Sequence, residues 1–251
     1  MGVKLISNGS VAPWNTKVIP PVTRGLEGWF TFDTEPRRFT FNRAMGKPDA
    51  AMSGSPVAYA THGRFKGLAN FLETQISETA NQTILIVCKA AAAIPAGSSG
   101  SGDSNTPFFV GNYLGPAVDA TGSSFGVNLF CTSQNILIGS ASRSNGSGGA
   151  TSSQVALNSE VATDWGIRCV RATASETVVF NLTKGIKVVA AQTAARVLAS
   201  TKARIGSATT SFAGEADISA VAIFSEALTD TEISSVAEVM RKRMTRLGIA
   251  V

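Results

Sequence analysis

The stretch SFAGEADISAVAIFSEALTDTEISSVAEV, residues 211–239, decides the fold because it joins a long strand to a capped helix. Residues 216–224 form an apolar, β-like run. Thr229 then precedes Glu232 by three positions, the spacing of a capping box, in which each side chain satisfies a free backbone N–H of the other residue. Apolar residues recur every three or four positions from Ile233 to Leu247, and Gly248 follows as a stop signal. This pattern predicts a strand followed by one C-terminal helix.

Short β-like runs fill the rest of the chain from Gly28 onward, between clusters of Gly, Ser, Asn and Pro, as is typical of an all-β sandwich. They cover 28–33, 38–42, 56–61, 67–73, 82–90, 107–113, 124–132, 135–141, 164–173, 176–183, 186–192, 203–208 and 216–224. The run from Ile84 to Val87 is apolar on both faces, which predicts a central strand. Two segments rich in Gly and Ser, 95–107 and 139–154, are expected to be mobile surface loops.

Residues 1–25 differ from this pattern, because three prolines punctuate a polar stretch that holds neither a helix nor an alternating strand. We interpret them as an extended arm. Its apolar Trp14, Val18 and Ile19 have no local core, so they either bind a neighbouring chain or pack across their own domain. The expected divisions are an arm at 1–25, a sandwich at 26–228 and a C-terminal helix and tail at 229–251 that packs on the sandwich.

The 251 residues carry a formal charge of +5, a modest excess that leaves the class of partner open. Basic residues gather at Arg37–Arg38 and in a run near the C-terminus, Arg241, Lys242, Arg243 and Arg246. We interpret the first group as a solvated face and the second chiefly as a complement to the helix dipole, with contact to an acidic partner as the alternative. Because no basic groove is interleaved with aromatic residues, nucleic-acid binding is not expected.

Cys88, Cys131 and Cys169 each lie inside an apolar run and none forms a Cys-x-x-Cys pair, which predicts buried free thiols and folding in a reducing cytoplasm. The N-terminus shows no apolar core of a secretory signal, so export by such a signal is not expected. No run approaches about 18 apolar residues, so membrane insertion is not expected either.

The inventory of chemically active residues argues against most enzyme classes. His62 is the only histidine, which excludes a two-histidine zinc site, and neither a nucleophile elbow nor a phosphate-binding loop is present. We therefore expect no cofactor and no metal.

Glu215, Asp217 and Ser219 point to one face of a strand, where a glycosidase would need two carboxyl groups about 5 Å apart or more. This pattern is similar to the acidic strand of laminarinase-like glucanases, Glu-x-Asp followed by a third acid, but Ser219 and Ala220 stand where the third acid would be. We interpret Glu215 and Asp217 as surface carboxylates, with a hydrolase as an alternative.

Two distant stretches together resemble laminin-G-like, concanavalin A-like jelly-roll domains. GLEGWFTFDTE at 25–35 resembles their opening strand, and the closing stretch resembles their final strand and tail. The matching residues of the closing stretch are Phe212, Gly214, Ile218, Val221, Ile223, Phe224, Ala227, Leu228, Thr229, Glu232 and Ile233. The resemblance implies an antiparallel two-sheet sandwich whose first and last strands pair. The family often has two acids directly before the valine, and here Ser219 and Ala220 take their place, which argues against its usual calcium or glycan contacts.

Lean domains of this kind with an N-terminal arm resemble those in virions of tailed bacteriophages. This resemblance implies a non-enzymatic structural or adhesive protein of a tail fibre, a tail tip or baseplate, or a head decoration, assembled in the host cytoplasm. Its partners would be other virion proteins and further copies of itself, with a trimer as one option. The alternatives are a carbohydrate-binding module that recognises host surface glycans, and a glycoside hydrolase. The candidate ligand-binding residues are Tyr113, Glu215 and Asp217, and the candidate partner-binding residues are Trp14, Val18 and Ile19.

Overall fold

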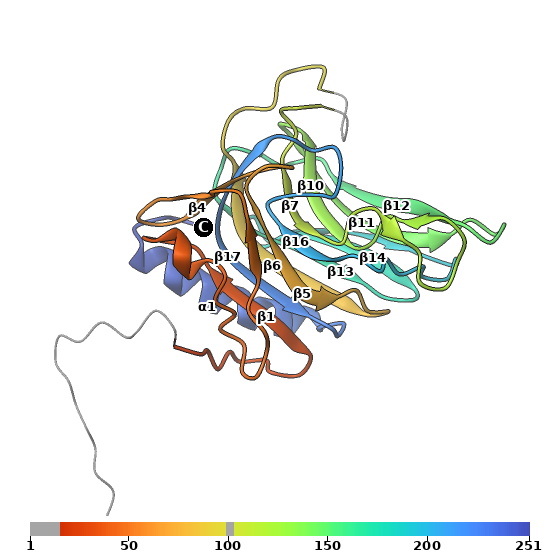
Figure 1. Cartoon of the computed structure of the whole chain (residues 1–251), viewed down its shortest axis with the longest axis horizontal. Coiled ribbons are helices and arrows are strands. Elements are labelled where there is room, and N and C mark those ends of the chain that lie inside the picture. The colour runs from red at the N-terminus through yellow and green to blue at the C-terminus, as the bar shows by residue number, and fades with distance from the viewer. Residues whose placement is uncertain (1–15, 99–102) are drawn as a thin grey trace, which may run out of the picture.

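The computed structural model describes residues 16–98 and 103–251. Two antiparallel sheets pack face to face and one helix lies against the outer face of the larger sheet (Figure 1). The eight-stranded sheet runs β15-β14-β13-β6-β17-β4-β3, with β1 also paired to β17. The seven-stranded sheet runs β12-β11-β10-β7-β16-β5-β2. The predicted jelly-roll sandwich with one C-terminal helix is therefore confirmed.

The strands of the larger sheet are β1 (Leu26–Thr31), β3 (Val57–Ala58), β4 (Gly63–Lys66), β6 (Gln82–Ala90), β13 (Gly166–Ala172), β14 (Glu176–Asn181), β15 (Ile186–Ala191) and β17 (Glu215–Phe224). Those of the smaller sheet are β2 (Ala51–Ser53), β5 (Phe71–Ser77), β7 (Phe108–Gly111), β10 (Asn128–Ser133), β11 (Ile136–Ser144), β12 (Ala150–Leu157) and β16 (Lys202–Ile205). The remaining elements are the short pair β8 (Gly115–Pro116) and β9 (Ser123–Ser124), the 3-10 turn η1 (Pro36–Arg38) and the helix α1 (Asp230–Arg246).

Strands β6 and β17 form the middle of the larger sheet. The stretch Ile84–Val87 is fully buried because its two faces enter two different cores. Ile84 and Ile86 face the smaller sheet, whereas Leu85 and Val87 face the helix. Two apolar faces on one strand therefore predicted a central strand correctly.

The first and last strands pair side by side, as the resemblance implied. β1 runs antiparallel to β17 from Leu26 to Thr31. Gly25 starts this pairing with φ +65°, and a Cβ at this position would lie 2.5 Å from the Glu226 side chain. The turn before the strand therefore requires glycine for both conformation and space.

Helix α1 covers the outer face of the larger sheet. Thr229 caps it, with the reciprocal Thr229–Glu232 capping box fully formed. Its buried Ile233, Val236 and Met240 pack with residues of β6, β13 and β17. Within the described residues, no helix is both long and apolar enough to cross a membrane.

Two secondary-structure expectations are wrong. Residues 38–42 do not form a strand: Pro36 opens the 3-10 turn η1, and Phe39 turns inward onto Phe32 and Phe65. The segment 139–154 is largely a regular hairpin, in which β11 and β12 pair from Leu137↔Leu157 to Ser144↔Ala150. Part of the other expected loop, 99–102, lies outside the described residues.

Candidate functional site

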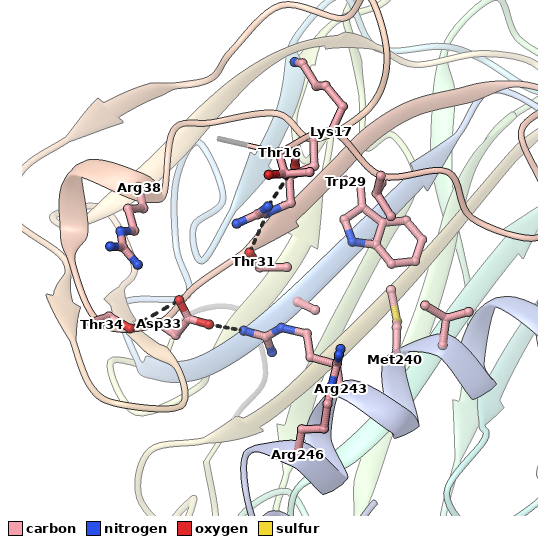
Figure 2. A pocket seen from close by; sticks show the side chains of 14 residues that line it. Thr16, Lys17, Trp29, Thr31, Asp33, Thr34, Arg38, Met240, Arg243 and Arg246 are labelled. Carbon is pink, nitrogen blue, oxygen red and sulfur yellow. Dashed lines mark hydrogen bonds and ion pairs between the residues drawn. The ribbon is translucent and has the colours of Figure 1, made fainter. Parts of the chain in front are cut away.

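A pocket of about 470 Å³ opens between the N-terminal segment, the end of β1 and helix α1 (Figure 2). Its walls come from distant parts of the sequence, because β1 and α1 are brought together by the pairing of β1 with β17. The lining residues are Thr16, Lys17, Val18, Trp29, Thr31, Asp33, Thr34, Arg38, Arg43, Ala220, Val239, Met240, Arg243 and Arg246.

This cationic pocket is strongly unbalanced in charge. Five of its lining residues are basic, Lys17, Arg38, Arg43, Arg243 and Arg246, and a single one, Asp33, is acidic. Clefts lined by one sign of charge concentrate counter-ions and charged ligands of the opposite sign. The pocket is therefore built to attract an anion.

Asp33 already binds one of these cations. Its Oδ2 accepts a hydrogen bond from Arg243 Nη2 at 2.6 Å, and Arg243 Nη1 donates to Ser219 Oγ at 2.6 Å. Both side chains of the ion pair are partly buried. Burial lowers the pKa of the Arg243 guanidinium despite the opposing effect of Asp33, and the charges of Arg43 and Arg246 lower it further.

Arg43 is held in place by neutral groups. Its Nε donates to Thr31 Oγ1 and its Nη1 to the Thr16 carbonyl, both at 2.9 Å. Burial lowers the pKa of Arg43, and Asp33 partly offsets that effect. Since an arginine keeps its charge at any physiological pH, Arg43 is a fixed cation whose Nη2 makes no hydrogen bond within the described part of the chain.

The rim of the pocket carries a more accessible cation. Arg246 is exposed near the end of α1 and has no hydrogen bond or ion pair within residues 16–98 and 103–251. Lys17 donates to the Asn42 carbonyl at 2.5 Å and lies over the Phe41 ring. Arg38 lies 3.6 Å from Glu35. Arg246 is thus the basic group of the pocket that is most available to a ligand.

The remaining wall is apolar. The Trp29 indole is 4% exposed and lies beside Met240 of α1 (Figure 2). Val18, Ala220 and Val239 also line the pocket. A pocket with cations on one side and carbon surface on the other suits a ligand that carries an anionic group on a compact carbon skeleton.

The structure separates the three arm residues that the sequence singled out. Trp14 lies outside the described residues. Val18 is partly buried, packs toward the core under α1 and donates its N–H to the Arg43 carbonyl at 2.8 Å. Ile19 is 83% exposed. Part of the arm therefore packs on its own domain and one apolar side chain points outward.

The Tyr113 ring packs against other aromatic rings and does not stand free as a stacking platform for a sugar. Its ring packs edge-on against Phe212 at 5.1 Å between centroids, and it also contacts Phe108 and Phe125 at 6.0 and 6.1 Å. These rings belong to a small cluster on the smaller sheet, which partly buries Tyr113.

Glu215 and Asp217 have different environments, and the interpretation of Asp217 as a surface carboxylate is wrong. Glu215 is exposed at the start of β17, whereas Asp217 is 1% exposed. Arg64 binds Asp217 with two hydrogen bonds of 2.8 and 3.0 Å, Lys89 lies 3.7 Å away and His62 lies 3.5 Å away. Register explains this: Asp217 pairs with Arg64 on one side and Lys89 on the other.

The sequence pattern singles out several residues of the cationic pocket but does not predict that they form one site. The sequence indicates a solvated face for Arg38 and a complement to the helix dipole for Arg243 and Arg246. No local pattern connects them with Arg43 or Asp33, because Arg243 and Asp33 are 210 positions apart. The one available signal was a cluster of basic residues on the last turns of the helix, beside its buried apolar face.

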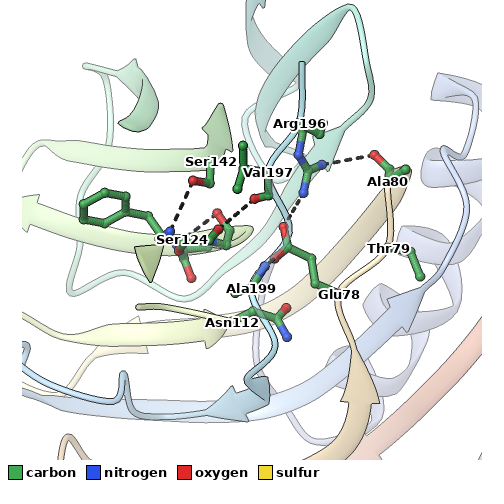
Figure 3. A network of polar contacts seen from close by, with 12 residues as sticks. Glu78, Thr79, Ala80, Asn112, Ser124, Ser142, Arg196, Val197 and Ala199 are labelled. Carbon is green, nitrogen blue, oxygen red and sulfur yellow. Dashed lines mark hydrogen bonds and ion pairs between the residues drawn. The ribbon is translucent and has the colours of Figure 1, made fainter. Parts of the chain in front are cut away.

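A second charged cluster is buried and structural (Figure 3). Glu78 and Arg196 form an ion pair with almost no exposure, and Glu78 Oε2 also accepts the Ala199 N–H at 2.6 Å. Arg196 donates to the Ala80 carbonyl. The pair fastens the segment after β15 to the end of β5. Its burial raises the pKa of Glu78 and lowers that of Arg196.

The described residues contain no group of three or more His, Cys, Asp or Glu side chains that could hold a metal ion. All three cysteines are free and buried.

No protein-family model matches the sequence, and no curated protein does either. Solved structures do share the fold. The binding domain of botulinum neurotoxin DC in complex with SialylT aligns with a TM-score of 0.56 and 7% identity, over 86% of this chain and 52% of that one. A botulinum neurotoxin type C structure, from work on the dependence of its cell entry on two ganglioside molecules, gives 0.56 and 8%, over 84% and 50%.

A mutant of Trypanosoma rangeli sialidase with trans-sialidase activity gives a TM-score of 0.57 and 9% identity, over 86% of this chain and 33% of that one. This chain thus spans about half of the neurotoxin structures and a third of the sialidase. At such identities the likeness shows a common β-sandwich fold.

Proposed function

We propose that this protein is a non-catalytic recognition protein that binds an acidic glycan in the cationic pocket, and that it serves in the virion of a tailed bacteriophage. The observation that carries the recognition proposal is the charge of the pocket: five basic side chains and one carboxylate surround about 470 Å³ beside an apolar wall. A neutral sugar has no anionic group to pair with these cations, whereas a sugar with a carboxylate does.

The pocket offers both parts of such a contact. Arg246 and the open Nη2 of Arg43 can donate charge-assisted hydrogen bonds to a carboxylate, which are stronger than neutral ones. Val18 and Val239, the partly exposed residues of the apolar wall, can pack against the carbon face of a pyranose ring. Three neighbours in fold are described with SialylT, with gangliosides and as a sialidase. They support an acidic sugar as the first ligand class to test.

The virion setting rests on other features. The sequence resembles laminin-G-like virion domains of tailed phages, in a tail fibre, a tail tip or baseplate, or a head decoration. Ile19 offers an exposed apolar contact for a neighbouring virion protein. The buried free thiols suit assembly in a host cytoplasm. A homo-oligomer would present several pockets, so that weak single contacts act together on a host surface.

The ligand proposal is tested by calorimetry with sialyllactose and lactose, which differ by one acidic sugar. We expect the full-length protein to bind sialyllactose and to bind lactose at least about tenfold more weakly. Arg246→Gln should weaken sialyllactose binding about threefold to tenfold. Lys242→Gln is the matched control, since it removes the same charge from an exposed position of the same helix outside the pocket.

Equal binding of the two sugars, or equal loss in the Lys242 and Arg246 variants, would contradict a specific acidic site. The virion setting is tested separately by immunodetection in purified phage particles. The wild-type chain should copurify with particles, and Ile19→Asp should reduce its incorporation. Absence of the wild-type chain from particles would end this part of the proposal.

A further inference from the structure

Strand β15 forms an open edge of the larger sheet. Within the described part of the chain it is the outermost strand, and its six residues pair only with β14, in a continuous register from Glu176↔Ala191 to Asn181↔Ile186. A strand with one neighbour presents unpaired N–H and C=O groups along its other side, which another strand can bind.

The side chains of this edge are apolar and exposed. Ile186, Val188 and Val189 are 36%, 38% and 50% exposed. They make up three of the nine large apolar residues that are exposed in the described part of the chain. Such residues are therefore concentrated on one six-residue strand, on both of its faces, rather than scattered singly.

The edge also lacks the usual protection against strand pairing. Exposed edges in monomeric proteins are protected by charges, prolines or bulges. β15 contains no proline and its register has no bulge. Its single charged residue is Lys187, whose Nζ binds Asp230 Oδ2 at 2.5 Å at the start of α1. The charge is thereby balanced within the chain and does not repel another molecule.

The strand is complementary to itself. In an antiparallel pair of strands related by a two-fold axis, opposite side chains lie on the same face of the sheet. The axis must therefore lie between the two copies of one residue, which are then opposite each other. An axis at Val188 puts Ile186 opposite Ala190 and Lys187 opposite Val189, whereas an axis at Val189 puts Lys187 opposite Ala191. Neither register brings the two lysines together. The first packs Val188 against its own copy, and the second packs Val189 against its own copy and Val188 against Ala190.

We infer that β15 is a homodimer interface, at which the open apolar edge of one copy pairs antiparallel with the same edge of a second copy and joins the two larger sheets. The contact is isologous and closes at two chains. This interface rests on the proposed function for its role: it specifies the homo-oligomer named there as a dimer, which would carry two cationic pockets. Its test uses no glycan, so failure of the interface and failure of glycan recognition are distinguishable.

The first measurement is the mass of the full-length protein by light scattering and sedimentation. We expect a dimer for the wild type and a dissociation constant at least about tenfold higher for Val189→Lys, with an unchanged circular dichroism spectrum. Val57→Lys is the matched control, because Val57 is also 50% exposed and lies on β3 at the opposite edge of the same sheet. It should remain a dimer.

The second measurement is oxidative cross-linking of single cysteine variants. A covalent dimer from V189C or from V188C places the axis at that residue, and V57C should give none. The native cysteines do not interfere because all three are buried. A wild-type monomer, an oligomer unaffected by Val189→Lys, or cross-linking of V57C as efficient as that of V188C and V189C would overturn the inference.

Discussion

The Asp33 carboxylate lies 2.6 Å from Arg243 Nη2 and so occupies, from within the chain, a position that an anionic ligand would seek. The pair joins the segment after β1 to α1. Asp33 is the one acidic group in the cationic pocket, and it competes with any ligand for Arg243.

We expect Asp33→Asn to increase the affinity for sialyllactose about threefold to tenfold, because one negative charge in a partly solvated site is worth about 1 kcal/mol. The variant should also lose about 1 kcal/mol of stability. Calorimetry and thermal unfolding measure the two effects. Asp119→Asn, an exposed change of the same charge outside the pocket, should alter neither. Weaker binding by the Asp33 variant would mean that Asp33 is itself a ligand contact.

The buried pair of Glu78 and Arg196 gives a prediction about stability. Removing one partner leaves a buried charge alone, so Arg196→Met should cost about 3–5 kcal/mol in denaturant unfolding. The double variant Glu78→Leu with Arg196→Met should cost less than the sum of the two single changes. Glu238→Gln, in an exposed ion pair, should stay within about 0.5 kcal/mol of the wild type.

The same pair gives the sign of a pH effect. Burial raises the pKa of Glu78 in the folded state. A raised carboxyl pKa means that this group favours the folded state below its unfolded pKa, and that this contribution is lost as the pH rises through the folded value. Loss of Arg196 raises the folded pKa further. The stability deficit of Arg196→Met should therefore shrink as the pH falls from about 7 toward about 4.5, and a deficit independent of pH would contradict this account.

Burial also predicts the reactivity of the thiols. It raises the pKa of Cys88 to about 11 and raises the pKa values of Cys131 and Cys169 as well. Thiolates are the reactive form, so the folded protein should show almost no reaction with Ellman's reagent at about pH 8. Denaturation should release three reactive thiols. Rapid labelling of the folded protein would show that one of these strands opens readily.

The helix cap provides a test of local stability. Thr229 Oγ1 accepts the Glu232 N–H while Glu232 accepts the Thr229 N–H, and Arg24 also binds Glu232. These bonds lower the pKa of Glu232 to about 2. Thr229→Ala should cost about 1 kcal/mol in chemical denaturation, whereas Thr231→Ala, exposed in the first turn, should cost less. Equal losses would show that the cap adds nothing.

The sequence predicted those parts of the fold that depend on local pattern. Gln82–Ala90 is a strand with the expected bounds because its apolar run has no polar interruption, and α1 begins where the capping box places it. The run 135–141 predicted the first part of β11, but the end of β11 and most of β12 were expected to be a loop because Gly and Ser dominate 139–154, including the buried Ser140 and Ser142. Their hydroxyls are satisfied by partners such as Asn128 Nδ2, which donates to Ser140 Oγ at 3.2 Å, so polar side chains can lie inside a sheet.

The cationic pocket could not be predicted from local sequence patterns for a different reason. Arg43, Arg243 and Asp33 meet through strand pairing over long separations, and each has an ordinary local explanation. Asp217 shows the same limit, since its position in a strand was predicted correctly, whereas its burial depends on Arg64 and Lys89 in the two neighbouring strands.

The two acids of β17 decide between a structural strand and a catalytic one. Asp217 is bound by Arg64 and approached by Lys89 and His62, so Asp217→Asn should remove a charge-assisted contact with the partly buried Arg64 and cost about 1.5–3 kcal/mol. Glu215 is exposed, and Glu215→Gln should change stability by less than about 0.5 kcal/mol. Unfolding curves for both variants, with a reducing-sugar assay on bacterial polysaccharides, separate the two roles. A structural Asp217 gives the large loss of stability with no cleavage by any form of the protein. Cleavage by the wild type that disappears in Glu215→Gln at unchanged stability would establish a hydrolase instead.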